Sequence, residues 1–196
     1  MKKTRFIKLI LFVIILFLGL YVAQKILIYL SVKEPIESLL EKFFVIELSS
    51  NEEDCSNLVS DKKIADIYNL KFKNLRESNQ FKENKKLKIN IKDVDKIENN
   101  KYIVNFSIIR EFTIKGSKDK SYAKDEYSAE IIKDNGKFLI SKLLDYFDYI
   151  QFLNIDETTS TLKNIPNRVL YSKQYDLIME NKKNKIENFT INKFEK

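Results

Sequence analysis

The sequence predicts an α+β domain that follows an N-terminal membrane-spanning helix. Three observations support this prediction: an apolar run near the N-terminus, a helical repeat of apolar residues in the first part of the chain, and a strict alternation of apolar and polar residues in the middle. Helices that precede a group of hairpin-connected strands are typical of α+β folds. We therefore expect a membrane helix and then a cone-shaped domain, in which helices pack on a curved four-stranded antiparallel sheet.

The membrane helix is predicted from the run Phe6 to Leu30, which follows the basic start MKKTR. Its uncharged core, Leu9 to Gln24, has 16 residues, which is short for a hydrocarbon layer of ~30 Å. Apolar residues resume after Lys25, and this favours a retained anchor over a cleaved signal peptide, which stays as the alternative. Basic residues ahead of the span predict a cytoplasmic N-terminus and an extracytoplasmic bulk, secreted if the run is cleaved.

This segment also accounts for most of the basic charge. The whole chain has a net charge of +7, with 35 basic and 28 acidic residues, and five of the basic residues lie in and around the apolar run: Lys2, Lys3, Arg5, Lys8 and Lys25. Without those five, 30 basic residues face 28 acidic ones, a net charge of about +2. The high isoelectric point therefore reflects membrane topology, and we expect no nucleic-acid partner.

Two helical stripes follow the anchor. After Pro35, which suits a first helical position, apolar residues recur at spacings of three and four up to Phe44. Asn51 to Val59 reads as a short helical segment or turn. Ser60 or Asp61 can cap the next helix, whose apolar stripe is Ile64, Ile67, Tyr68, Phe72 and Leu75. We expect both stripes to pack on one face of the sheet.

Four strands are predicted after Phe81, where the period changes to two. The first surrounds Leu87 to Lys92, and a polar turn at residues 98–100 separates it from a long second strand, 102–114. The third strand covers 122–133, Asp134-Asn135-Gly136 is a hairpin turn, and the fourth strand covers 137–147. Hairpin connections make this sheet an antiparallel meander.

Three regions follow from these elements: 1–32 as cytoplasmic tail and anchor (or signal peptide), 33–156 as the α+β domain, and 157–196 as a C-terminal helix and loose tail. Apolar residues from Val169 to Ile178 predict one more helix. We expect the stretch after Glu180 to be frayed, with Lys182 to Lys185 as a solvated basic cluster. The wealth of Lys, Asn and Ile is typical of an AT-rich bacterial genome, as in the Firmicutes.

The predicted order of elements resembles the nuclear transport factor 2-like superfamily over Pro35 to Asp156. Within it, KLKINIKDVDKIENNKYIVNFSIIREFTI and DEYSAEIIKDNGKFLISKLLDYFDY look like the domain that precedes the catalytic module of clostridial amidase-domain proteins. The shared pattern is a long strand, a hairpin, the run Lys133 to Ile140 and an acidic-aromatic tail. The Cys and His of an amidase module do not follow in the remaining 40 residues, so we expect no amidase activity.

The resemblance implies a membrane-anchored, non-catalytic binding or assembly module at a bacterial cell surface, with protein partners or self-association and attachment to the membrane through Phe6 to Leu30. Scaffold subunits of conjugation and type IV secretion machines share this size and topology, and they stay an alternative. A small-molecule binder or enzyme that uses the interior of the cone is the third possibility.

Enzymes of this superfamily use Asp, His or Tyr inside the cone for proton transfer, and this chain has no histidine. The pocket candidates are Arg110, Asp125, Tyr127 and Tyr146. Arg110 interrupts an apolar strand face, where it can pair with Glu126 or Glu130 or hold an anionic group. The interface candidates are the aromatic residues Phe147, Tyr149 and Phe152.

No residue set predicts a metal site or a cofactor. Residues 51–54 are acidic but lack the alternation and the glycine of a calcium loop. Cys55 is the single cysteine, so the chain forms no intramolecular disulfide, and we expect a half-buried, unreactive thiol on a short helix. We therefore expect no catalytic centre.

Overall fold

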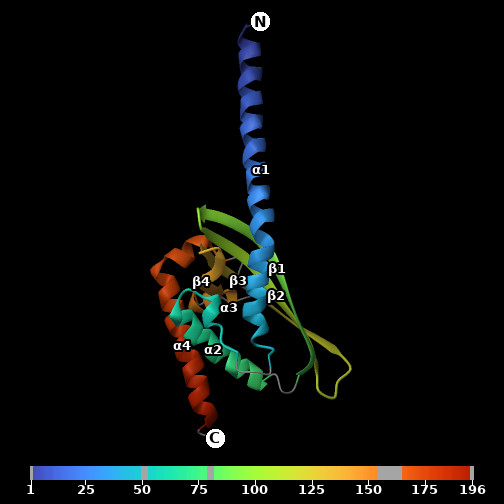
Figure 1. Cartoon of the computed structure of the whole chain (residues 1–196), viewed down its shortest axis with the longest axis vertical. Coiled ribbons are helices and arrows are strands. Elements are labelled where there is room, and N and C mark those ends of the chain that lie inside the picture. Colours follow the sequence, from blue (N-terminus) through green and yellow to red (C-terminus); the bar gives the residue numbers. More distant parts are fainter. Residues whose placement is uncertain (1, 50–52, 79–81, 154–164, 195–196) are drawn as a thin grey trace. The chain divides into compact units, whose positions relative to one another are not determined.

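The computed structural model describes residues 2–49, 53–78, 82–153 and 165–194, and it divides the chain into two compact units. Unit 1 is Met1–Glu34 and unit 2 is Pro35–Lys196. Figure 1 shows the elements along the chain. The expected boundary between 156 and 157 lies outside the described residues.

Unit 1 is a single helix, the first part of α1 (Lys2–Val45). Side chains that belong in apolar surroundings, such as Leu16, Phe17 and Leu20, are between half and two thirds exposed. The helix is long and apolar enough to cross a membrane. The expected break at Pro35 is wrong, because α1 continues through it to Val45. Proline removes one backbone donor but has a helical φ angle, so it does not have to end a helix.

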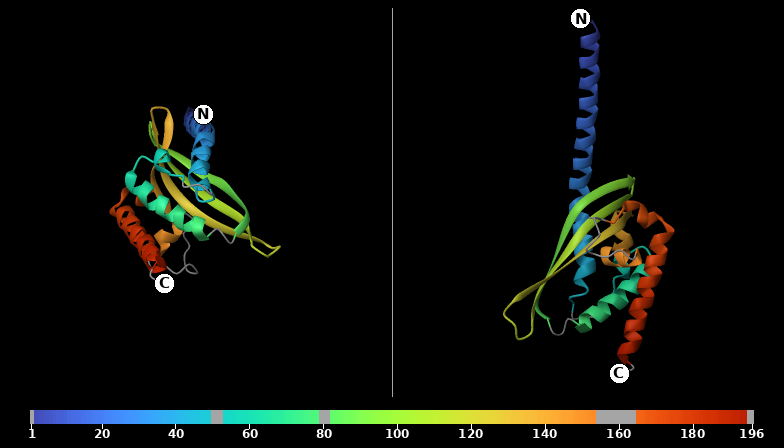
Figure 2. Two further views of the ribbon diagram at one scale, coloured as in Figure 1. Left: turned by 60° about the horizontal axis from the view of Figure 1, so that its bottom comes forward. Right: turned by 180° about the vertical axis from the view of Figure 1, so that it is seen from behind.

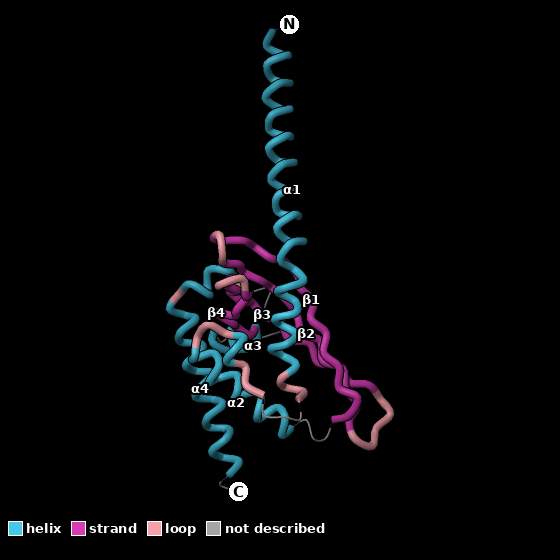
Figure 3. The backbone as a smooth tube through the Cα atoms, in the orientation of Figure 1, coloured by secondary structure: helices cyan, strands magenta, loops and turns pink. Residues whose placement is uncertain are grey.

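Four antiparallel strands form the sheet of unit 2, in the order β1-β2-β3-β4. Their bounds are β1 Lys82–Glu98, β2 Lys101–Ile114, β3 Lys120–Asp134 and β4 Lys137–Asp145. Asn135 (φ 48°) and Gly136 (φ 80°) turn the last hairpin in left-handed conformations, as an Asn-Gly turn requires. The α+β class and the antiparallel meander are confirmed, and Figure 3 shows the separate helical and strand parts.

The fourth strand is shorter than predicted. It ends at Asp145, and Tyr146–Phe152 form the helix α3. The Asp145 carboxylate accepts a hydrogen bond from the Phe147 backbone N–H at 2.8 Å. An aspartate in this capping position stabilises the first turn of a helix, and this ends the strand two residues before the expected point.

Aromatic side chains fill the space between the helices and the sheet. The helices are the end of α1, α2 (Lys62–Ser78), α3 and α4 (Lys173–Phe194). The Phe43 ring lies 5.0–5.3 Å from the rings of three fully buried neighbours, Phe44, Tyr68 and Phe72. Phe44 reaches the sheet, where its ring is 5.1 Å from that of Tyr127. Aromatic clusters with these edge-to-face geometries are energetically favourable.

The C-terminal part of the chain packs against β3 and against the helices α2 and α3. The 3-10 helix η3 (Asn167–Tyr171) lies against the sheet face opposite Phe106, where Asn105 Nδ2 donates to Asn167 Oδ1 at 3.4 Å. Helix α4 then lies beside α2 and α3, as both views of Figure 2 show. The expected frayed tail after Glu180 is wrong, since α4 continues to Phe194.

Candidate functional site

Arg110, the strongest candidate from the sequence, is held in a network of carboxylates. Its Nε and one Nη pair with the two oxygens of Glu47, the second at 2.9 Å, and its other Nη pairs with Asp125. Glu47 is only 2% exposed, so the guanidinium balances a buried negative charge. The pairing with Glu126 or Glu130 is wrong: Glu126 forms salt bridges with Lys92 and Lys124, and the nearest cation to Glu130 is Lys142, at 3.9 Å.

Tyr127 and Tyr146 do not join Arg110 in an open pocket. Tyr127 is buried, and its ring stacks on that of Phe106 at 5.4 Å. Tyr146 is half-buried as the first residue of α3. Among the interface candidates, Phe147 is 52% exposed and Phe152 is half-buried. Tyr149 is buried on the inner side of α3, so its place in an exposed aromatic surface is wrong.

The most unusual group inside unit 2 is Lys182 on α4, which is 4% exposed. Its ammonium group is 2.7 Å from the Asp148 carboxylate and donates to the Tyr68 hydroxyl at 3.2 Å. It also lies 4.8 Å from the centre of the Tyr68 ring, within the range of a cation–π interaction. One lysine therefore joins α2, α3 and α4.

A second ion pair adjoins the first. Lys71 of α2 lies 3.5 Å from the Asp145 carboxylate, so that two lysines face two aspartates. We call the four residues, with Tyr68, the charge network. Its charges balance, and buried charges are tolerated in proteins when they are paired in this way.

The pKa values of the network follow from these contacts. Burial raises the pKa of Tyr68 to about 12, against the effect of Lys182. Burial also opposes the ionisation of Asp145, but Lys71 and Lys182 hold the pKa of that carboxyl below its usual value. Burial acts against the charged form of Lys182, yet Tyr68 and Asp148 raise its pKa above the ordinary one. These contacts thus favour the charged forms of Asp145 and Lys182, whereas burial and the neighbouring Lys182 lower the pKa of Lys71.

The sequence holds one signal that Lys182 faces the core. Tyr175, Ile178 and Met179 form an apolar stripe on α4, and Lys182 continues it at the spacing of a helix. A lysine at such a position places its apolar stem, and sometimes its charge, against the core. The expected solvated basic cluster is therefore wrong for Lys182, whereas Lys183 and Lys185 are exposed.

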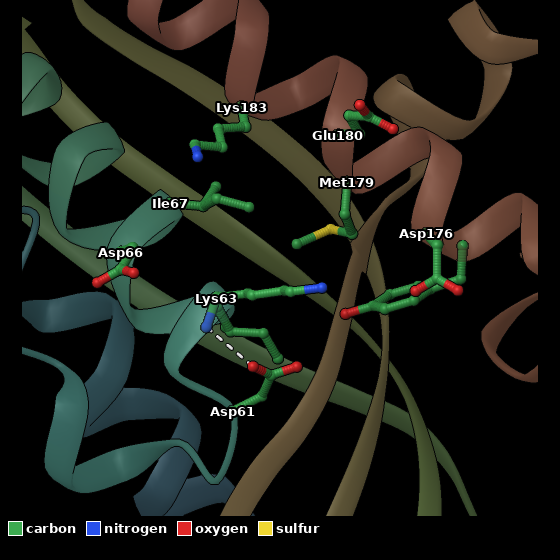
Figure 4. Close-up of a pocket in the computed structure, with 10 residues that line it drawn as sticks. Asp61, Lys63, Asp66, Ile67, Asp176, Met179, Glu180 and Lys183 are labelled. Carbon is green, nitrogen blue, oxygen red and sulfur yellow. Dashed lines mark hydrogen bonds between the residues drawn. The ribbon is translucent and has the colours of Figure 1, made fainter.

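An open groove lies on the outer side of the helices, between α2 and α4 (Figure 4). Its volume is about 430 Å³, which falls within the usual size range of ligand sites. Met179 and Ile67 point toward each other across its floor, and Lys63 and Lys183 extend into it from opposite helices. Asp61 at its edge accepts a hydrogen bond from the Lys63 backbone N–H at 2.8 Å. Such an amphipathic groove can hold a ligand with both charged and apolar parts.

Reactive side chains are scarce in the part of the chain that the structure describes. It holds no group of three or more His, Cys, Asp or Glu side chains placed to bind a metal ion. Cys55 is fully buried, and this burial raises the pKa of its thiol to about 12. A thiol with such a pKa is a poor nucleophile.

Comparisons with known proteins give little further information. No family model matches the chain, and no curated protein matches it. A solved structure that is similar to it is the intermembrane space region of the chloroplast protein ARC6, with 9% identity and a TM-score of 0.35. The alignment covers 56% of this chain and 92% of that chain. A likeness at this level carries no argument about function.

Proposed function

We propose that this chain is a membrane-anchored, non-catalytic binding or assembly module with a nuclear transport factor 2-like domain on the extracytoplasmic side of a bacterial membrane. The observation that carries the proposal is the filled interior of unit 2. The rings of Phe44, Tyr127 and Phe106 contact one another in the space between the helices and the sheet. The guanidinium group of Arg110 forms salt bridges with Glu47 and Asp125.

The outer surface supports binding better than the interior does. The α2–α4 groove is open to solvent and combines an apolar floor with charged side chains from two helices. This observation favours a second candidate within the same proposal, namely a binder of a small amphipathic molecule or peptide. The scaffold role in a secretion or conjugation machine stays a prediction of the sequence.

The orientation of the domain is tested with an introduced cysteine. Asn99→Cys places a thiol in the exposed β1–β2 turn, whereas the native Cys55 is buried and serves as the unlabelled background. We expect a membrane-impermeant maleimide to label the variant in intact cells and to leave the wild-type chain unlabelled. Labelling that occurs only after lysis would place the domain in the cytoplasm and overturn the proposal.

The binding role is tested by crosslinking in the membrane. We expect the full chain to give a defined crosslinked species, either an oligomer or a complex with one partner, and groove variants such as Met179→Lys to weaken it. The matched control Leu177→Lys changes an exposed residue of the same helix. A chain that stays monomeric and unliganded would contradict the assembly role.

A further inference from the structure

The end of the sheet that carries the β2–β3 turn is strongly basic. Residues 82–88 and 109–124, which come together there, include nine basic and three acidic residues, a net charge of +6. The rest of unit 2 has 20 basic and 24 acidic residues, a net charge of −4. The small overall charge of the domain therefore hides a steep separation of charge. We call this end of the sheet the basic end.

Much of this positive charge is not compensated. Three of its cations are paired: Arg110 with Glu47 and Asp125, Lys120 with Glu111, and Lys124 with Glu126. Five further lysines are exposed, and among the described residues none of them takes part in a salt bridge: Lys85, Lys86, Lys88, Lys115 and Lys118. Uncompensated like charges repel one another, so a surface of this kind gains free energy when an anion neutralises it.

The basic end also has a hollow whose lining includes apolar and aromatic side chains. A shallow hollow of about 380 Å³ lies on one face of the strands, lined by Lys86, Lys88, Ile109 and Tyr122 with Leu87 and Glu111. Tyr122 is 63% exposed. The β2–β3 turn projects beyond α2 and α4 in Figures 1 and 2, so these helices do not cover this end.

We propose that the basic end binds a linear polyanion, a flexible polymer with repeated phosphate groups, with Tyr122 and the hollow holding one segment of it. The lysines lie along β1 and in the β2–β3 loop, and Lys82 covers the Phe112 ring on the opposite face at 4.5 Å. A flat bilayer would meet one face of these strands, whereas a flexible chain can follow both faces and the turn. This inference rests on the proposed binding function and names the chemistry of one partner.

The test uses the full chain in nanodiscs of zwitterionic phosphatidylcholine and fluorescent inorganic polyphosphate as the probe. We expect the variant K85Q/K86Q/K88Q/K118Q to bind at least tenfold more weakly at ~100 mM salt, and its affinity to depend less steeply on salt. The control K62Q/K96Q/K137Q/K173Q changes four exposed lysines outside the basic end by the same total charge. We expect it to bind within twofold of wild type. Tyr122→Ala should lower the affinity several-fold without changing the salt dependence.

Two outcomes would overturn the proposal. If the basic-end variant and the control lose the same affinity for polyphosphate, the chain binds this polymer through its net charge alone. If the chain does not bind polyphosphate but binds vesicles with 30% phosphatidylglycerol, and the basic-end variant loses this binding, the partner is a membrane surface. Both outcomes are independent of the labelling of Asn99→Cys, so the failure of this inference is distinguishable from a failure of the proposed function.

Discussion

At the scale of single residues, the main feature of unit 2 is the pairing of its buried and half-buried charges. Arg110 balances the buried Glu47, and Lys182 balances Asp148. The two cases differ in what surrounds them, since Asp125 beside Arg110 is 43% exposed while Tyr68 beside Lys182 is fully buried. A buried charge that loses its partner is costly, because the remaining ion has no water to solvate it.

Lys182→Met should therefore destabilise the domain by ~3 kcal/mol, because Asp148 and Tyr68 lose the cation that they share. The measurement is the free energy of unfolding of the full chain in detergent, followed by denaturant. Lys183→Met, a change of the exposed neighbour, is the control and should change stability by less than about 0.5 kcal/mol. Equal effects of the two substitutions would contradict the burial of Lys182.

Asp145 gives a prediction about pH. Its pKa is lowered in the folded state, where Lys71 and Lys182 outweigh the effect of burial. A lowered folded-state pKa contributes stability above the unfolded pKa of about 4, and this contribution is lost as the pH falls through the folded pKa. Asp145→Asn keeps a good helix cap and removes the charge.

We expect Asp145→Asn to lower the free energy of unfolding by about 1–3 kcal/mol at pH 7 and this difference to be smaller at pH 2, because protonation of Asp145 removes the same charge. Unfolding curves at the two pH values check this. If the variant and the wild type differ by the same amount at both values, the charge of Asp145 contributes nothing to stability.

At the scale of elements, turns and caps decide where strands end. The hairpin between β3 and β4 needs two residues with positive φ, Asn135 and Gly136. A Cβ on Gly136 would meet no neighbouring atom, so the cost of a substitution there is conformational. Any L-residue with a side chain is disfavoured at this φ.

Gly136→Ala should accordingly destabilise the domain by about 1–2 kcal/mol. Asn135→Gly is the control, because glycine accepts the same left-handed conformation, and it should be close to neutral. Thermal unfolding of both variants distinguishes these expectations. A neutral Gly136→Ala would mean that the turn adopts another conformation.

The elements also show what a sequence can and cannot reveal. The strand 102–114 was predictable because its alternation is long and a one-residue shift would expose every apolar side chain. The end of β4 was not predictable in this way, since Tyr146 and Phe147 continue an apolar run and only the cap at Asp145 stops it. The helical stripe of α4 places Lys182 toward the core, but its partner Tyr68 was not predictable, because Tyr68 lies 114 residues away and a local pattern does not report a distant contact.

At the scale of the whole molecule, the chain combines an apolar helix with a domain of opposite character. Unit 1 is long and apolar enough to cross a membrane, and unit 2 carries its charges in a basic end and an acidic remainder. Membrane attachment should therefore depend on unit 1 alone.

Leu16→Arg with Leu20→Arg places two charges in the middle of the apolar helix, at a cost of ~3 kcal/mol for each arginine in the bilayer. We expect the wild-type chain to resist extraction from membranes at alkaline pH and this variant to be extracted. Ile97→Arg with Leu177→Arg adds two charges to exposed positions of unit 2 and should leave the chain in the membrane. Extraction of both variants would show that unit 2 also contributes to attachment.

The contact between Lys182 and Tyr68 has a consequence for biosynthesis. The two residues are separated by 114 positions, so a ribosome makes nearly all of the domain before it makes the lysine that neutralises Asp148. Contacts of such long range slow the final step of folding. A nascent chain that stops short of α4 lacks Lys182 and the apolar residues Tyr175, Ile178 and Met179, which are buried in the complete domain, and we expect it to be a substrate for proteases until the last helix has been translated.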